Sequence, residues 1–110
     1  DVMRDEIERQ DVQLKKNVTN MRALQSLTAS LPGLCRTEDM RMAMKNLAED
    51  FRDSDPVSSD ATLEQEQELK FMVNEIQRVL IDGDEKSAMS FCTRVKNALV
   101  ERNRVCKLNK

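Results

Sequence analysis

The stretch from Asp60 to Lys110 decides the fold, and its sequence is DATLEQEQELKFMVNEIQRVLIDGDEKSAMSFCTRVKNALVERNRVCKLNK. Two long segments of it carry apolar residues at every third or fourth position, the spacing of one face of an α-helix. Between them, Ile81-Asp82-Gly83-Asp84 combines a glycine suited to the left-handed end of a helix with an aspartate suited to begin the next. The stretch therefore predicts two amphipathic helices folded back on each other as a hairpin.

The two helices of this hairpin are expected at about residues 61–81 and 85–108. The first is polar from Glu64 to Glu68 and apolar from Leu69 onward, so we expect its buried part to be the half nearest the turn. The second carries a 3.6-residue apolar stripe, and Arg102 falls inside it. That arginine must extend to solvent, pair with an acid or reach a partner. The stripe consists of Ala88, Phe91, Cys92, Val95, Ala98, Leu99, Val105 and Cys106.

The composition of the chain also favours helices. Its 110 residues include two glycines, two prolines and no tryptophan or tyrosine, whereas seven methionines occupy apolar positions. Methionine loses little rotamer freedom in a helix and packs adaptably. The chain is long enough for one domain with a modest core. We therefore predict an all-α fold, an antiparallel bundle of three to four helices.

A long N-terminal helix is predicted from Val2 to Ser30. Its apolar residues follow a heptad-like spacing with polar interruptions on the seam, which is typical of a partial coiled coil. They are Met3, Ile7, Leu14, Val18, Met21, Leu24, Leu27 and Leu31. We expect residues 1–31 to form a coiled-coil-like helix that lies along the hairpin or pairs with a second copy of itself as a homodimer. A frayed N-terminal helix is the alternative.

Another helix is predicted from Thr37, a good N-cap residue, to about Arg52. Leu31-Pro32-Gly33 separates it from the N-terminal helix, because proline disfavours helical geometry in the residue before it and Gly33 can take a positive φ. One face of this helix carries Met40, Met44, Leu47 and Phe51. Residues 37–110 are thus expected to form a helical bundle that ends in the hairpin.

A polar loop from Asp53 to Asp60 connects this helix to the hairpin. Its crowded aspartates resemble a calcium-binding loop, but the required frame of ligands and glycine is missing. Ser58 and Ser59 are candidate caps for the following helix and candidate phosphorylation sites.

Charge is unevenly distributed along the chain, although the formal net charge is only −2. Acids dominate residues 49–68 and bases dominate residues 86–110. A mostly basic ridge is expected beside the apolar stripe of the last helix, formed by Lys86, Arg94, Asn97, Glu101 and Arg104. The ridge is a solvated face, a binding face for an acidic protein surface, or a contact for membrane or nucleic acid. The acidic segment argues against membrane, and the lack of tryptophan and tyrosine leaves little platform for stacking bases. We predict neither of those last two partners.

Catalysis is nearly excluded by the residue types. Histidine is absent, which removes the commonest general base and most mixed-ligand zinc sites, and two glycines cannot build a phosphate-binding loop. Cys92 and Cys106 lie about 21 Å apart if both sit on one helix, so they cannot bridge within it. Together with Cys35 they are expected to be reduced thiols in a cytoplasmic protein. We predict no enzyme activity, no cofactor and no metal site.

The last two helices resemble those of BAG-domain co-chaperones, especially the branch with an N-terminal coiled coil and a dimeric helical domain. The residues behind this resemblance are Lys70, Phe71, Ile76, Leu80, Asp82, Lys86, Val95, Leu99, Arg104, Val105, Lys107 and Leu108. In that family two long terminal helices contact the nucleotide-binding domain of seventy-kilodalton heat-shock chaperones. The resemblance implies that this chain holds such a domain open and promotes nucleotide exchange, with no chemistry of its own.

The resemblance further implies a protein-contact surface made of residues that flank the apolar stripes. These residues are Glu75, Arg78, Arg94, Asn97, Glu101 and Arg104. The sequence thus predicts a protein–protein interaction module, with a co-chaperone as its sharpest form. The alternative is a structural coiled-coil or helical-bundle segment of a larger cytoskeletal or trafficking scaffold, in which the N-terminal helix dimerises.

Overall fold

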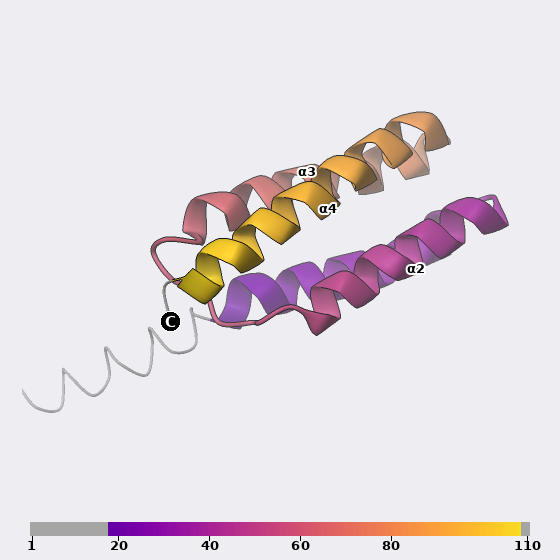
Figure 1. Cartoon of the computed structure of the whole chain (residues 1–110). Helices are drawn as coiled ribbons and strands as arrows, with labels where there is room; N and C mark the ends of the chain where they lie inside the picture. The colour runs from indigo at the N-terminus through magenta and orange to yellow at the C-terminus, as the bar shows by residue number, and fades with distance from the viewer. Residues whose placement is uncertain (1–17, 109–110) are drawn as a thin grey trace, which may run out of the picture.

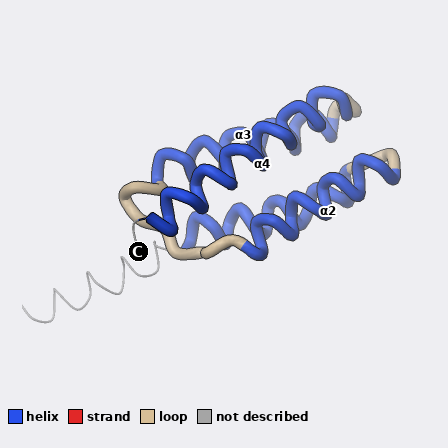
Figure 2. Tube along the Cα trace, in the orientation of Figure 1, coloured by secondary structure: helices blue, strands red, loops and turns tan. Residues whose placement is uncertain are grey.

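The computed structural model describes residues 18–108, and within that range it contains helices and no strand (Figure 1). A first helix runs through residues 18–30 and continues into a short 3-10 helix, η1 (Leu31–Leu34). Three longer helices follow: α2 (Glu38–Asp53), α3 (Leu63–Ile81) and α4 (Glu85–Leu108). Short turns lie before α2 and before α4, whereas a longer loop, residues 54–62, joins α2 to α3, as Figure 2 shows. The predicted all-α fold is confirmed, and the predicted limits of the last helix agree with those of α4.

The helices form two hairpins that lie side by side, the first helix with α2 and α3 with α4 (Figure 1). The helix α2 runs parallel to α4: Thr37 bonds Glu85 at one end, and Ser54 bonds Asn103 at the other. The helix α4 packs against both α3 and α2, whereas α3 contacts η1. The loop between α2 and α3 must therefore pass from one hairpin to the other across one end of the bundle.

The core of the bundle is built from the apolar stripes that the sequence shows. The helix α2 buries its predicted face, Met40, Met44, Leu47 and Phe51. The first helix contributes Met21 and Leu24 to the same core. This part of the heptad-like stripe thus packs along the bundle of its own chain. The predicted coiled-coil positions Met3, Ile7 and Leu14 lie outside the described residues.

The turn between α3 and α4 has the conformation that its sequence predicts. Gly83 has a φ of 85°, and the guanidinium of Arg36 lies over it so closely that an added Cβ would meet Nη1 at 2.9 Å. The amides of Gly83 and Asp84 donate to the carbonyls of Leu80 and Val79, the double closure of a Schellman motif. Gly33, which can take a positive φ, does not do so, because residues 31–34 close as a 3-10 turn instead.

The start of α3 differs from the prediction in three respects. The helix begins at Leu63 rather than Ala61, because the amide of Thr62 donates to the carbonyl of Ser59 and its hydroxyl accepts from the amide of Ser59, which holds residues 59–62 in a turn. Ser58 does not cap the helix, since its hydroxyl donates to the side chain of Glu66 instead. Burial is also not confined to the half of α3 nearest the turn, because the side chain of Glu66, in the polar half, is fully buried.

No helix within residues 18–108 is both long enough and apolar enough to span a membrane.

Candidate functional site

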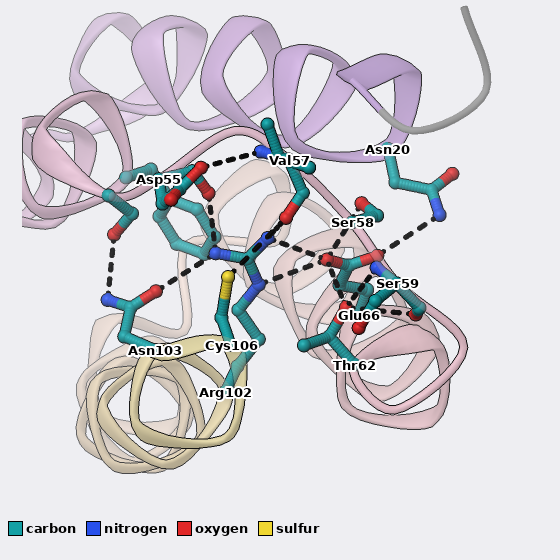
Figure 3. A network of polar contacts seen from close by, with 12 residues as sticks. Asn20, Asp55, Val57, Ser58, Ser59, Thr62, Glu66, Arg102, Asn103 and Cys106 are labelled. Atoms are coloured by element: carbon teal, nitrogen blue, oxygen red, sulfur yellow. Dashed lines mark hydrogen bonds and ion pairs between the residues drawn. The ribbon is translucent and has the colours of Figure 1, made fainter. Parts of the chain in front are cut away.

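A buried ion pair lies at the end of the bundle where the loop crosses between the hairpins (Figure 3). Arg102 of α4 and Glu66 of α3 both have fully buried side chains. Arg102 donates from Nε to Oε2 of Glu66 at 3.0 Å, and its Nη2 forms an ion pair with the same oxygen at 2.9 Å. Its remaining groups donate to the loop, from Nη1 to the carbonyl of Asp55 at 2.6 Å and from Nη2 to that of Val57 at 2.9 Å. Arg102 therefore pairs with an acid, one of the three outcomes that its place in the stripe leaves open.

The carboxylate of Glu66 is surrounded by further donors. The hydroxyls of Ser58 and Thr62 donate to Oε2 at 2.9 and 3.1 Å, and Asn20 of the first helix donates to Oε1 at 3.2 Å. The Glu66–Arg102 clamp, as we call this pair with its bonded neighbours, thus joins the first helix, the loop, α3 and α4. A carboxylate that accepts from so many internal donors is held as a structural group, and burial makes each of those bonds necessary.

A groove of about 240 Å³ opens beside the clamp, between the first helix and α3. Its lining includes Ala23, Leu63, Glu66 and Lys70. Glu66 supplies the one carboxylate in the lining of this groove, and its oxygens already accept hydrogen bonds within the clamp. This end of the bundle is therefore a structural junction.

The six predicted contact residues fall into separate groups on α3 and α4. On α3, Arg78 bonds Glu75 at 2.8 Å and approaches Asp82 at 3.8 Å. On α4, the guanidinium of Arg104 bonds both carboxylate oxygens of Glu101, with an Nε–Oε2 distance of 3.2 Å. This hydrogen bond lowers the pKa of the Glu101 carboxyl. Each pair thus neutralises its charge within its own helix.

The other two predicted residues lie on α4 and are exposed. Arg94 lies over the ring of Phe91, 6.0 Å from its centroid, a weak cation–π contact. Asn97 lies one turn further along the same helix. The antiparallel packing of the hairpin brings Glu75 and Arg78 of α3 to the level of the first half of α4, while Glu101 and Arg104 lie near its end.

Two exposed apolar side chains that sequence reasoning missed share the face of the α4 residues. Val100 is 69% exposed and Leu108 is 70% exposed, the two largest fractions among the large apolar side chains of residues 18–108. We call this face the α4 ridge, which consists of Arg94, Asn97, Val100, Glu101, Arg104 and Leu108. Positions 97, 100, 101, 104 and 108 follow the helical repeat, so their side chains are neighbours. The sequence carries only part of the signal: Val100 and Leu108 are apolar residues outside the predicted stripe, but periodicity does not decide whether a neighbouring helix covers them.

The three cysteines offer no reactive group at the surface. Cys35, Cys92 and Cys106 are all buried, and none is joined in a disulfide. Burial raises the pKa of the Cys92 thiol, as does the nearby Asp50, while Lys96 acts in the opposite direction. These thiols therefore pack as small apolar groups.

Comparison with known proteins adds no relative. No protein-family model matches the chain. No curated protein and no solved structure is significantly similar to it either.

Proposed function

We propose that this chain is a protein–protein interaction module whose α4 ridge binds a folded partner. The observation that carries the proposal is the exposure of Val100 and Leu108 among charged residues that are already paired within the helix. Burying these two side chains in an interface would contribute about 1.5–3 kcal/mol each. Apolar anchors surrounded by polar residues are the usual composition of such a contact.

The sharpest form of this proposal is a co-chaperone. The resemblance of α3 and α4 to BAG-domain helices supports one identity for the partner. This partner is the nucleotide-binding domain of a seventy-kilodalton heat-shock chaperone. In that role the hairpin would act as a rigid wedge that favours the open domain and speeds nucleotide release, because a ligand shifts a conformational equilibrium only by preferring one state. The Glu66–Arg102 clamp would supply rigidity at the open end of the hairpin. Buried unpaired cysteines suit the reducing cytoplasm, where we place this activity.

The co-chaperone form is tested by the release of a labelled nucleotide from the purified nucleotide-binding domain of such a chaperone. We expect the chain to accelerate release, and Val100→Glu combined with Arg104→Glu to weaken binding by roughly tenfold or more. The matched control is Met42→Glu combined with Lys45→Glu, which makes the same kind of change on the exposed face of α2. The control should retain full activity.

The outcomes of this experiment distinguish the co-chaperone form from the broader proposal of a protein–protein interaction module. If the wild-type chain neither binds the chaperone domain nor alters nucleotide release, the co-chaperone form is wrong. The broader module is then tested by capture of proteins from a cell lysate. A captured protein that is lost with the ridge variant and kept with the α2 variant supports the ridge, whereas equal capture by both variants overturns it.

A structural segment of a larger scaffold is the second proposed function. The heptad-like spacing of Met3, Ile7 and Leu14 favours it, because such a stripe pairs helices of two chains. In this case the N-terminal stripe would form the partly coiled-coil helix of a homodimer, and the bundle would serve as a spacer. Light scattering of the full chain tests this, since a strict monomer at high concentration contradicts it.

A further inference from the structure

The outward face of α3 carries an exposed stripe that neither the core nor the α4 ridge uses. We call it the α3 stripe, and it consists of Glu64, Gln67, Phe71, Asn74 and Arg78, all of them exposed. The side chain of Phe71 is 64% exposed, while Phe51 is fully buried and Phe91 is half-buried. The stripe lies opposite the buried face of the same helix, so α3 presents Phe71 directly to solvent.

The order of residues along the α3 stripe is symmetric about Phe71. Glu64 lies seven residues before it and Arg78 seven residues after it, which places opposite charges roughly 10 Å to either side along the helix axis. The amides Gln67 and Asn74 lie between the charges and the aromatic ring. A second copy of α3 running in the opposite direction would therefore place an acid opposite a base at both ends, and a ring opposite a ring in the middle.

We propose that two copies of this chain associate through their α3 stripes, antiparallel, about a two-fold axis at Phe71. In this dimer Phe71 packs on the partner's Phe71, Glu64 pairs with the partner's Arg78, and Gln67 meets the partner's Asn74. A two-fold interface uses the same patch on both copies, which requires a self-complementary pattern of this kind. A parallel arrangement would place like charges opposite each other and is disfavoured.

The existing contacts of Arg78 are compatible with the dimer. Arg78 bonds Glu75 through Nε and Nη2, and its guanidinium has five donors, so it can also serve an acid of a second chain. Glu68, one turn from Glu64, adds a second acid near the incoming arginine. The α4 ridge lies on another helix and remains available, so the dimer does not depend on the proposed partner contact.

Charge exchange between two variants tests this arrangement directly. In Glu64→Arg two arginines would face each other at each end, and in Arg78→Glu two acids would do so. We expect sedimentation velocity to show each variant dimerising at least roughly tenfold more weakly than the wild-type chain. Mixing the two variants should restore association, because each end of the mixed dimer then pairs an arginine with a glutamate. Association through another segment, such as the N-terminal stripe, predicts no such dependence on mixing.

Two further variants complete the experiment. Phe71→Glu should also dissociate the dimer, and its exposed position means that the fold, followed by circular dichroism, should be kept. Met42→Glu on α2 is the matched control and should leave the dimer intact. The proposal is overturned if the wild-type chain is monomeric at all concentrations. It is equally overturned if the dimer survives Phe71→Glu, which would assign association to another segment, or if mixing fails to restore it.

Discussion

The two ends of the α3–α4 hairpin are held together by different physical means. At the turn end, Gly83 allows the backbone to close on itself, and the amides and carbonyls of the turn bond each other. Apolar residues such as Leu80 and Ala88 fill the space beneath. At the loop end, by contrast, a charged side chain from α4 lies fully buried and bonds the backbone of a loop from another part of the chain.

The difference follows from what each connection must span. A tight turn between neighbouring helices satisfies its own backbone groups. The loop after α2 crosses the end of the bundle, so the carbonyls of Asp55 and Val57 point inward without helical partners. A buried carbonyl needs a donor, and a guanidinium supplies five of them from one residue. Arg102 meets this need, and Glu66 compensates its charge.

Breaking the clamp should produce the largest loss of stability in the molecule. Arg102→Met removes the donors and leaves the carboxylate of Glu66 buried without its cation. We expect a cost of about 3–5 kcal/mol, typical of a buried pair with one partner removed. Chemical denaturation followed by circular dichroism measures it.

A double-mutant cycle separates charge from hydrogen bonding at the clamp. Glu66→Leu alone should also be severely destabilising, whereas combined with Arg102→Met it should cost less than the sum of the single changes. The double variant should nonetheless remain less stable than the wild type, because the two loop carbonyls still lack donors. Strictly additive costs would show that Glu66 and Arg102 do not stabilise each other.

Sequence reasoning predicted the turn end well and the loop end poorly. Thr37, Gly83 and Asp84 are local signals, and each acts where the sequence places it because a cap or a turn depends on residues a few positions away. The sequence places Glu66 in the polar half of its helix, outside the expected buried part, because it lies in a run of charged residues. Yet it lies three residues before Leu69 and seven before Val73, on the buried face. Glu66 lies in the apolar stripe of α3, and Arg102 lies in that of α4. A charged residue within each stripe was therefore the sequence signal for a buried ion pair.

The turn end should respond to a core deletion more moderately. Leu80 is buried near the turn, and Leu80→Ala removes its apolar surface and leaves a cavity. We expect a cost of about 2–4 kcal/mol from lost burial and packing. The same denaturation experiment measures it, with Ile81→Ala as the control, since Ile81 is 61% exposed and should have little effect. If Leu80→Ala cost more than Arg102→Met, the contrast between the ends would be reversed.

A smaller effect is expected from the turn glycine itself. Gly83→Ala places a Cβ at positive φ, which costs an ordinary residue about 1–2 kcal/mol. The new Cβ also meets the end of the Arg36 side chain, which is flexible and can move aside. Thermal denaturation should show this loss, and Gly33→Ala should show none of it, because nothing lies within 4 Å of the added atom and Gly33 has no positive φ.

The candidate binding surface was predictable only in part. The charged members of the α4 ridge were found because they flank an apolar stripe, but a search for charge overlooks Val100 and Leu108. Their exposure could not be read from periodicity alone, because a hydrophobic residue just outside a stripe can still be covered by a neighbouring helix. The arrangement of α2 and α3 around α4 decides that both side chains face solvent.

The smallest expected effect concerns the first turn of α4. The carboxylate of Asp84 accepts from the hydroxyl of Ser87 at 2.7 Å and from its amide at 3.1 Å, and these bonds lower the pKa of Asp84. A group with a lowered pKa in the folded state contributes stability above its ordinary pKa, and this contribution is lost as the pH falls through the folded value. Asn at this position also caps a helix, so Asp84→Asn removes the charge while keeping the cap.

Asp84→Asn should therefore lower Tm slightly at neutral pH, and the difference from wild type should shrink as the pH falls below the ordinary aspartate value of 3.8. Titration of the Asp84 carboxyl by NMR should give a pKa below that value, and Ser87→Ala should move it back toward 3.8, because the hydroxyl of Ser87 is the main cause of the shift. A Tm difference that does not change with pH would mean that the stabilisation comes from the geometry of the cap alone. In that case charge would not stabilise the turn end, and the difference from the clamp, which depends on a charged pair, would be larger.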